Sequence, residues 1–311
     1  MSLTTIKQIQ SSVLNPEGAW DWDMQKEIAN IKPPDLLMGV RRDMMHGEII
    51  REWSKWIIEQ FIDERNITDD ISFPLILSDI NQTISELVGK QISSSDKREI
   101  VIAISRVVFN RVEQLNRLRA KRASITNQLK CDLLSIYGPR PRCWLTGYQF
   151  SDEAIHNFTA KKGEMRDIKL PVFIDKYKPM GLVVRDLTIE VDHLYPFSLG
   201  GGDDIQNYRL ICGWANKVKS NHISGYSAGT RADITTQLFP KRYYYWVVRL
   251  IGMRRKCEVD GCSNNIHNSE LTVRSSLGDS KLVTPISMQV VCQHHASLLA
   301  GRYVKRTIYE N

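Results

Sequence analysis

The side chains best suited to chemistry are concentrated in residues 189–222. An acid and an imidazole, Asp192 and His193, close a short apolar run, and a glycine-rich loop (200–202) leads from them to a second apolar run. A polar segment with the character of a helix follows and carries Asn216. Phosphodiester cleavage needs a group that deprotonates water and a cation that stabilises the charge developing on the phosphate. A histidine suits the first task and a carboxylate that holds a hard cation suits the second, so this segment predicts phosphodiester hydrolysis.

The geometry of a strand limits how Asp192 and His193 can act together. Successive side chains of a strand point to opposite faces, so two neighbours share one site only at a strand end or a bulge. The residues that follow, Leu194-Tyr195-Pro196, break a strand soon after His193. We therefore expect both side chains to reach one site from the end of this strand.

Further groups in the segment suit a phosphate site. Asn216 would supply a neutral oxygen ligand from the first turn of the expected helix. Asn207 follows the glycine-rich loop, where its amide could hold the loop or orient the imidazole of His193. Lys217 and Lys219 lie on or just beyond the same helix, and we expect them to contact phosphate oxygens.

The order and spacing of these residues match a known motif. That motif runs Asp-His, then Pro-x-Ser-x-Gly-Gly, then Asn, then Leu-x-Cys-x-x-Cys-Asn-x-x-Lys. The chain reads Asp192-His193, Pro196-Phe197-Ser198-Leu199-Gly200-Gly201, Asn207, and Leu210-Ile211-Cys212-Gly213-Trp214-Ala215-Asn216-Lys217-Val218-Lys219. On these residues the segment resembles the HNH nuclease family, whose core is a ββα-metal fold.

The resemblance implies a role for each of these residues. His193 would be the general base, Asp192 and Asn216 would hold a divalent cation, Mg²⁺ or Mn²⁺, and Asn207 would orient the base. His222, beyond Asn216, is an alternative or supplementary metal ligand. The competing interpretation is an inactive ββα fold that only binds nucleic acid.

The chain departs from the family pattern at a structural zinc site. Many members surround the motif with two Cys-x-x-Cys knuckles, whereas this chain reads Cys143-Trp-Leu-Thr146 and Cys212-Gly-Trp-Ala215. Because only half of the ligands remain, we predict that Cys143 and Cys212 are packing residues.

A separate cysteine pattern in the C-terminal part of the chain predicts a zinc site. Cys257-x4-Cys262 is followed by Cys292-x2-His295, which supplies three thiolates and one imidazole for a tetrahedral structural site. His294 competes with His295 for the fourth position, and chance clustering of free cysteines is the alternative. The flanking sequences MRRKC and GRYVKR are basic, so this lobe could also contact DNA.

Composition and charge predict a globular protein with a polyanionic partner. Apolar residues make up 42% and charged residues 25% of the 311 residues. No signal peptide or membrane span is expected, so we expect a cytoplasmic protein. Residues 1–96 contain 9 Lys and Arg and 16 Asp and Glu, which gives a net charge of −7. The whole chain contains 42 Lys and Arg and 35 Asp and Glu, so the remaining residues contain 33 and 19, a net charge of +14. A basic C-terminal two-thirds suits a phosphate backbone, and a merely solvated basic surface is the alternative.

The first part of the chain is expected to be largely helical. Apolar residues recur at helical spacing in 47–65, so Trp53 and Trp56 are predicted to pack in a core. A run without Gly or Pro, 97–137, predicts one long helix or two helices joined near Ser124. The basic residues of its middle, either phosphate contacts or an exposed helix face, are Arg111, Arg117, Arg119, Lys121 and Arg122.

These observations predict an α+β chain of three parts. Residues 1–138 would form a helical region for DNA recognition or dimerisation, 139–230 the HNH core, and 231–311 the zinc-bound lobe. No internal repeat is apparent in the sequence. The expected function is a metal-dependent endonuclease that cuts double-stranded DNA, a sequence-specific restriction-type enzyme of bacterial or phage origin acting as a homodimer. A homing or nicking HNH endonuclease and a catalytically silent nucleic-acid-binding protein are the alternatives.

Overall fold

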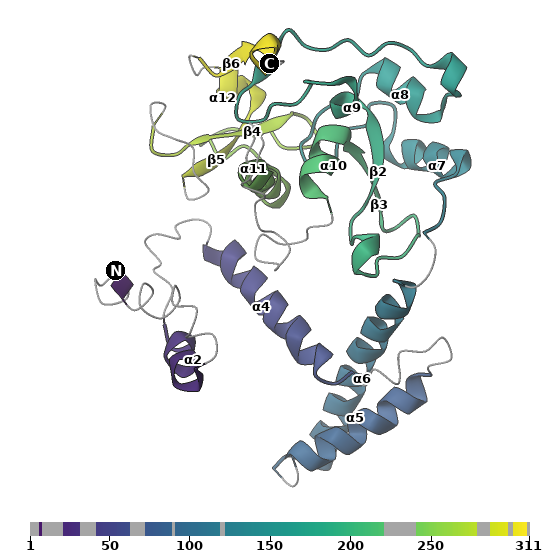
Figure 1. The fold of residues 1–311 in the computed structure, drawn as a ribbon, viewed down its shortest axis with the longest axis vertical. Coiled ribbons are helices and arrows are strands. Elements are labelled where there is room, and N and C mark those ends of the chain that lie inside the picture. The colour runs from purple at the N-terminus through teal and green to yellow at the C-terminus, as the bar shows by residue number, and fades with distance from the viewer. Residues whose placement is uncertain are drawn as a thin grey trace. The chain divides into compact units, whose positions relative to one another are not determined.

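The described residues form an α+β fold of helices and small antiparallel sheets (Figure 1). The computed structural model describes residues 6–7, 21–31, 42–62, 72–88, 91–118, 122–220, 241–278, 287–297 and 301–309. The chain divides into two compact units, Met1–Arg51 and Glu52–Asn311. The expected boundary at 138 falls inside the second unit, and the one at 230 lies outside the described residues.

The helices and strands have the following bounds. The helices are α2 (Trp22–Ala29), α4 (Arg42–Glu59), α5 (Phe73–Val88), α6 (Ser94–Arg117), α7 (Asn127–Tyr137), α8 (Asp152–Thr159), α9 (Val184–Leu187), α10 (Gly213–Lys219), α11 (Lys241–Arg254) and α12 (Gln293–Ser297). The strands pair as β1 (Phe173–Asp175) with β6 (Tyr303–Lys305), β2 (Ile189–His193) with β3 (Tyr208–Cys212), and β4 (Leu271–Ser275) with β5 (Met288–Cys292). Within these described ranges, no helix has the length and apolarity to cross a membrane.

Helix α4 forms where the helical spacing predicts it, but its aromatic residues do not lie in a core. Trp53 and Trp56 are each 58% exposed, so the prediction that they pack is wrong. The residues of this segment that do pack, Ile58, Phe61 and Ile62, lie at the C-terminal end of α4 and just beyond it. The helical spacing identified an apolar stripe, but only its last part meets the core of α5 and α6.

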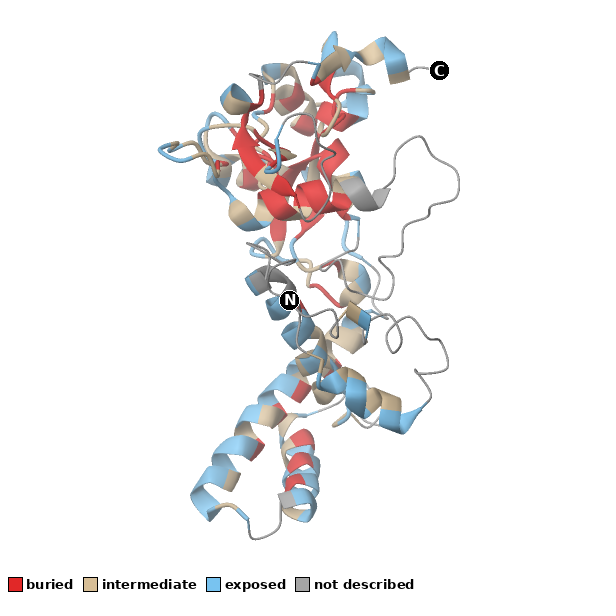
Figure 2. Cartoon of the chain, turned by 90° about the vertical axis from the view of Figure 1, so that its left-hand side faces the viewer, coloured by how far each residue is buried: buried red, intermediate tan, exposed pale blue. Residues whose placement is uncertain are grey.

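Helices α5 and α6 pack against each other through aliphatic side chains that face one another (Figure 2). Helix α6 begins after Ser93, whose side chain accepts a hydrogen bond from the backbone N–H of Asp96 at 3.1 Å and satisfies the first turn. The Gly- and Pro-free run 97–137 is divided into α6 and α7, and residues 122–126 between them are not helical. Of the two alternatives, two helices joined near Ser124 is therefore confirmed.

The segment with the candidate chemistry forms a hairpin followed at once by a helix. Strands β2 and β3 pair from Ile189 opposite Cys212 to His193 opposite Tyr208. Helix α10 starts at Gly213, where a Cβ atom would lie only 2.0 Å from the carbonyl oxygen of Arg185. Only glycine fits this close approach, which turns the chain directly from strand into helix.

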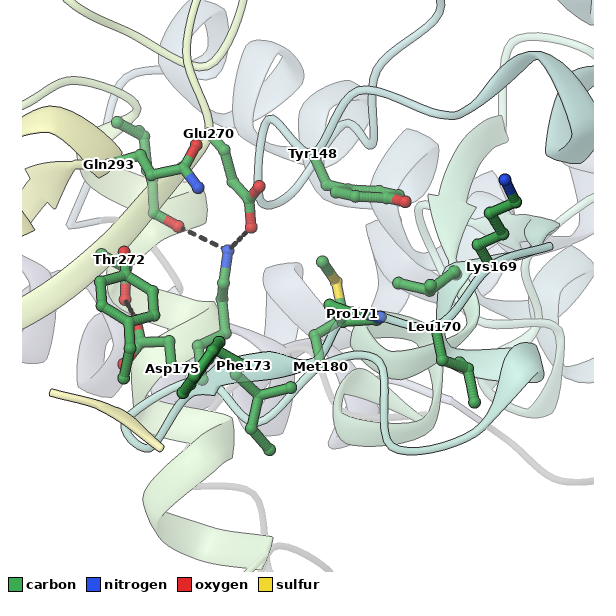
Figure 3. Close-up of a pocket in the computed structure, with 15 residues that line it drawn as sticks. Tyr148, Lys169, Leu170, Pro171, Phe173, Asp175, Met180, Glu270, Thr272 and Gln293 are labelled. Carbon is green, nitrogen blue, oxygen red and sulfur yellow. Dashed lines mark hydrogen bonds and ion pairs between the residues drawn. The ribbon is translucent and has the colours of Figure 1, made fainter. Parts of the chain in front are cut away.

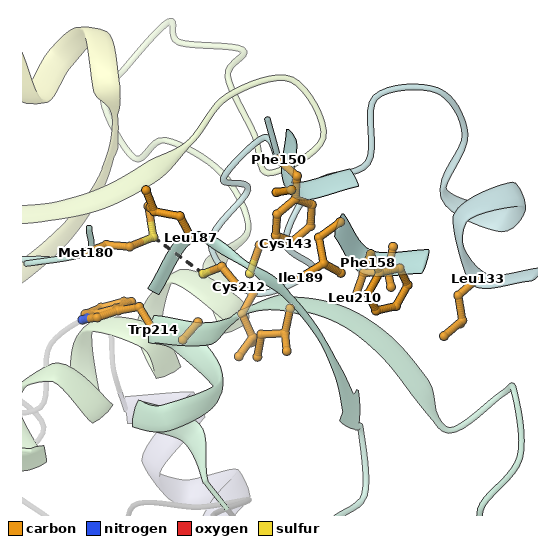
Figure 4. Close-up of a cluster of buried hydrophobic side chains, with 14 of the residues drawn as sticks. Leu133, Cys143, Phe150, Phe158, Met180, Leu187, Ile189, Leu210, Cys212 and Trp214 are labelled. Carbon is orange, nitrogen blue, oxygen red and sulfur yellow. Dashed lines mark hydrogen bonds between the residues drawn. The ribbon is translucent and has the colours of Figure 1, made fainter. Parts of the chain in front are cut away.

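The hairpin and helix are held by a core that their buried faces share with side chains between Leu133 and Leu187 and with Val248 (Figure 4). Leu210 and Cys212 of β3 are fully buried, and Trp214 of α10 is almost so. Cys143 is 1% exposed, and the Cys212 thiol donates to the Met180 sulfur at 3.6 Å. Both cysteines therefore serve as packing residues, as predicted.

Candidate catalytic and zinc sites

His193 is the last residue of β2 and is held on both ring nitrogens. Its Nε2 lies 2.8 Å from Oδ1 of Asp203, and its Nδ1 lies 3.3 Å from a guanidinium nitrogen of Arg122. A carboxylate oxygen can only accept, so Nε2 carries the proton and Nδ1 keeps its lone pair. The imidazole also packs edge-on against Tyr208, and the residue is 5% exposed. The ring is thus oriented with one basic nitrogen facing Arg122.

Asp203 is the residue that orients this imidazole. Burial alone would raise the pKa of the carboxyl, but hydrogen bonds from the Ala123 backbone N–H, from His193 and from the Tyr208 hydroxyl lower it overall. A carboxyl with a lowered folded pKa stabilises the protein above its ordinary value of 3.8, and this stabilisation is lost as the pH falls through the folded pKa. In turn, burial and the contact with Asp203 raise the pKa of Tyr208 to about 12.

Asn207 holds the glycine-rich loop that carries Asp203. Its side-chain NH2 donates to the carbonyl oxygens of Tyr195 and Gly202 at 3.0 and 2.9 Å, and its Oδ1 accepts from the Tyr195 backbone N–H at 2.9 Å. Asn207 was expected either to hold the loop or to orient the imidazole of His193. Its hydrogen bonds in the structure hold the loop. A Cβ atom on Gly201 would lie 1.9 Å from the Tyr195 oxygen, so the loop needs glycine there.

Asp192 is buried and already balanced by a cation of the protein itself. Its Oδ1 accepts from the Lys219 ammonium at 2.8 Å, and its Oδ2 accepts from the Trp144 indole N–H at 3.2 Å. The same ammonium donates to the backbone oxygen of His193 at 3.0 Å. Burial raises the pKa of the Asp192 carboxyl, and Lys219 opposes that shift. Lys219 therefore points inward and does not contribute a phosphate contact from the surface.

Asp192, His193 and Asn216 line one hollow of about 270 Å³, together with Arg122. Two neighbouring strand residues thus share one site at the end of β2, as the geometry of a strand requires. The side-chain NH2 of Asn216 donates to Glu190 at 2.6 Å, which leaves its oxygen as a ligand. The donors fit a hard cation in type, but both oxygens of Asp192 already accept hydrogen bonds.

Some of the basic side chains predicted to contact phosphate are exposed, and others are paired within the fold. Arg122 is exposed and lines this hollow, Lys217 is exposed and lines a neighbouring hollow that shares Asn216, and Arg117 is exposed at the end of α6. Arg111 pairs with Glu59 at 2.8 Å, so its charge is used within the fold. The remaining predicted residues, which lie outside the described part of the chain, are Arg119, Lys121 and His222.

The four predicted zinc ligands come together in one cluster. The ligand atoms of Cys257, Cys262, Cys292 and His295 all lie within 4.8 Å of one another. Nδ1 of His295 is 3.4 Å from the sulfurs of Cys257 and Cys292, and the sulfurs of Cys262 and Cys292 are 4.0 Å apart. Bonds of about 2.3 Å to sulfur and about 2.0 Å to nitrogen in a tetrahedron require separations of this size. The cluster can hold a metal such as zinc, and His295 rather than His294 belongs to it.

A second hollow, of about 440 Å³, lies between the segment around β1 and strand β4 (Figure 3). Three of its charged groups are paired. Lys178 forms an ion pair with Glu270 and donates to the Leu271 oxygen at 3.0 Å, and Asp175 accepts from the buried Arg302 at 2.6 Å. The Thr272 hydroxyl also donates to Asp175 at 2.6 Å and joins β1 to β4, so we assign these charges a structural role.

Comparisons with models of known families, with curated proteins and with solved structures found no match to this chain. The arrangement of the described residues therefore carries the functional argument.

Zinc analysis tests the cysteine and histidine cluster. We expect about one tightly held zinc per chain, because three thiolates and one imidazole complete a closed tetrahedral site. His295→Ala should lose the zinc and part of the stability, whereas the matched control His294→Ala should keep both. Metal analysis with thermal unfolding measures this, and a zinc-free wild-type protein would contradict the site.

A double-mutant cycle tests the buried ion pair. Asp192→Ala should lower the free energy of unfolding by about 3–5 kcal/mol, because it leaves the Lys219 ammonium buried and unpaired. Asp192→Ala/Lys219→Met should lower it by less than the sum of the single changes, with a coupling of about 1–3 kcal/mol. Denaturant unfolding measures the cycle. Additive effects would show that the two groups do not interact.

Proposed function

We propose that the chain is a metal-dependent DNA endonuclease in which His193 activates water. The observation that carries the proposal is the arrangement of the imidazole: Asp203 fixes Nε2, and Nδ1 faces a hollow that also contains an acid, an amide and a guanidinium. A histidine held in one tautomer with an unprotonated nitrogen is suited to general-base catalysis, once Arg122 leaves that nitrogen.

The residues of the chain define the proton path. A water beside Nδ1 would give up a proton to His193, and its oxygen would attack phosphorus as the bond to the leaving oxygen breaks. The leaving oxygen takes a proton from solvent. The Asp203 carboxylate stabilises the imidazolium that forms, because it accepts the proton on Nε2 in a hydrogen bond. Arg122, which faces Nδ1 in the free protein, would turn to the phosphate and leave room for water.

Asp192 and Asn216 would hold Mg²⁺ or Mn²⁺. The cation would supply positive charge against the phosphate and the leaving oxygen. Because the Lys219 ammonium already lies 2.8 Å from Asp192, a cation must compete with it for the carboxylate. The free protein is therefore expected to bind the cation weakly.

The basic balance of the chain supports double-stranded DNA as the substrate. The net charge outside residues 1–96 is +14. Exposed Arg122 lines the hollow, and exposed Lys217 lines a neighbouring hollow that shares Asn216. Clustered positive charge attracts a phosphate backbone and makes binding depend on salt. We further propose a sequence-specific restriction-type enzyme, acting as a cytoplasmic homodimer in bacteria or phage. A homing or nicking endonuclease and a silent DNA-binding protein remain the competing functions.

Plasmid cleavage tests the assigned base. In Mg²⁺ or Mn²⁺, His193→Ala should lower the rate by about 10²–10⁴-fold, since proton transfer by a positioned side chain is lost. Asp203→Asn should give a smaller loss and change the pH–rate profile, while His267→Ala, at an exposed position outside the hollow, serves as the control. Full activity of His193→Ala would overturn the assignment. If the wild-type protein gave only open-circular product, this would favour a nicking enzyme. DNA binding without any cleavage would favour a catalytically silent DNA-binding protein.

Metal titration tests the competition at Asp192. Lys219→Met should bind Mn²⁺ more tightly than the wild type, because the carboxylate loses its internal cation. Lys217→Met, which removes an exposed lysine of the same helix, should leave the affinity unchanged. Calorimetric titration measures both variants. Unchanged or weaker Mn²⁺ binding by Lys219→Met would show that Asp192 does not hold the cation.

A further inference from the structure

Two parts of the chain repeat one structural unit. Each consists of a short knuckle that carries a cysteine, a five-residue antiparallel hairpin, and a helix that starts directly after a second cysteine. We infer that the zinc-binding lobe is a second copy of the unit that carries Asp192 and His193. We infer further that the first copy keeps half of the same zinc site, which two substitutions can complete. This inference does not depend on nuclease activity.

The hairpins and helices of the two copies correspond residue by residue. Strand β2 pairs with β3 over five positions that end at Cys212, and β4 pairs with β5 over five positions that end at Cys292. The next residue starts the helix in both copies, and its N–H bonds back to the residue before the first strand. The two bonds are Gly213 to Thr188 at 3.1 Å and Gln293 to Glu270 at 3.1 Å.

The knuckles correspond in their backbone hydrogen bonds as well. An antiparallel bridge closes each knuckle, at Arg142 with Gln149 and at Lys256 with Asn265. Inside the bridge, the N–H of the cysteine bonds across the knuckle, and the N–H of the next residue bonds to the middle of the last strand. In the first copy these bonds are Cys143 to Tyr148 at 2.8 Å and Trp144 to Leu210 at 3.0 Å; in the second they are Cys257 to Asn264 and Glu258 to Val290, both at 2.8 Å.

This correspondence places the zinc ligands of the second copy onto named residues of the first. Cys257 and Cys292 correspond to Cys143 and Cys212, and both pairs are buried. The other two ligands, Cys262 and His295, correspond to Thr146 and Ala215, which are fully buried. The knuckle of the second copy is two residues longer, which accounts for the wider cysteine spacing there.

One distance shows that the replaced position still faces the remaining ligand. The Oγ1 atom of Thr146 lies 4.0 Å from the Cys212 sulfur, and the sulfur of Cys262 lies 4.0 Å from that of Cys292. Thr146 thus sits in the first copy where a metal ligand sits in the second. Cysteine is close to threonine in size, so a sulfur can replace this hydroxyl with little disturbance.

The residues suited to catalysis occur in the first copy, whereas the complete set of metal ligands occurs in the second. The residues of the second copy that correspond to Asp192, His193 and Asn216 are Arg274, Ser275 and Ala296. Arg274 donates to Gln289 at 2.8 Å, and the Ser275 hydroxyl accepts from the Leu277 N–H at 3.2 Å, so both serve the fold. The second copy offers no carboxylate, imidazole or amide at these positions. It holds the metal and the first copy holds the candidate chemistry.

Thr146→Cys/Ala215→Cys tests the inference in the full-length protein. It adds two thiolates to Cys143 and Cys212 and gives zinc a four-thiolate site. We expect zinc to rise from about one to about two per chain, and Co²⁺ loading to show a second tetrahedral thiolate centre. The same two changes combined with Cys143→Ser and Cys212→Ser leave only two thiolates; this matched control should return the zinc content to about one.

A folded double variant that holds no more zinc than the wild type would overturn the inference. If the double variant misfolds, Thr146→Cys alone, which is the smaller change, provides the test. Three thiolates should then capture about one extra Cd²⁺, seen as thiolate charge-transfer absorption in addition to that of the wild-type cluster. Absence of that absorption in folded protein would also overturn the inference. Failure of both variants to fold would count against it equally, because the correspondence requires a cysteine to be accommodated at position 146.

Discussion

The ion pair between Asp192 and Lys219 determines how the candidate site is built. It joins the end of β2 to the end of α10. The indole N–H of Trp144, in the first knuckle, donates to the same carboxylate. Removing both charges from water costs several kcal/mol per ion, so the pair persists only because additional hydrogen bonds accompany it. These bonds are supplied by Trp144 and by the carbonyl oxygen of His193. The position of His193 is thus fixed through its backbone by the group that neutralises its neighbour.

Close backbone approaches complete this arrangement and explain where glycine is needed. Gly213 allows the start of α10 to lie against the Arg185 carbonyl oxygen, and Asn216 of the same helix reaches the hollow beside Asp192. Gly201 allows the loop to pass against Tyr195, where Asn207 holds it and Asp203 reaches the imidazole. Neither approach tolerates a Cβ atom, so the loop path and the orientation of His193 depend on each other.

The sequence predicted the local parts of the site better than its long-range contacts. The hairpin and the helix depend on short spacings, and the structure forms them where those spacings indicate. The four predicted metal ligands form two pairs of short spacing, which the fold brings together across the 30 positions from Cys262 to Cys292. No spacing in the sequence indicates Asp203, because its role depends on the path of the loop. The sequence predicts a phosphate contact for Lys219 because a helical lysine is usually exposed, whereas this one turns toward a buried acid. The helical spacing predicts a core position for Trp53 because it shows an apolar stripe but not the partner of that stripe.

The repeated unit cannot be recognised from the sequence for a related reason. What the copies share is a hydrogen-bond pattern and two cysteines, while the residues between differ and the knuckles differ in length. A zinc ion and a packed core are two ways to fix the same hairpin and helix. In the second copy the cluster can hold a metal beside a buried apolar core that includes Leu271, Val273 and Val290. In the first copy Cys143 and Cys212 pack in the core with Met180. Asp192 and His193 lie toward the end of the hairpin away from Cys212, so the chemistry and the position of a zinc ion occupy different ends of the unit.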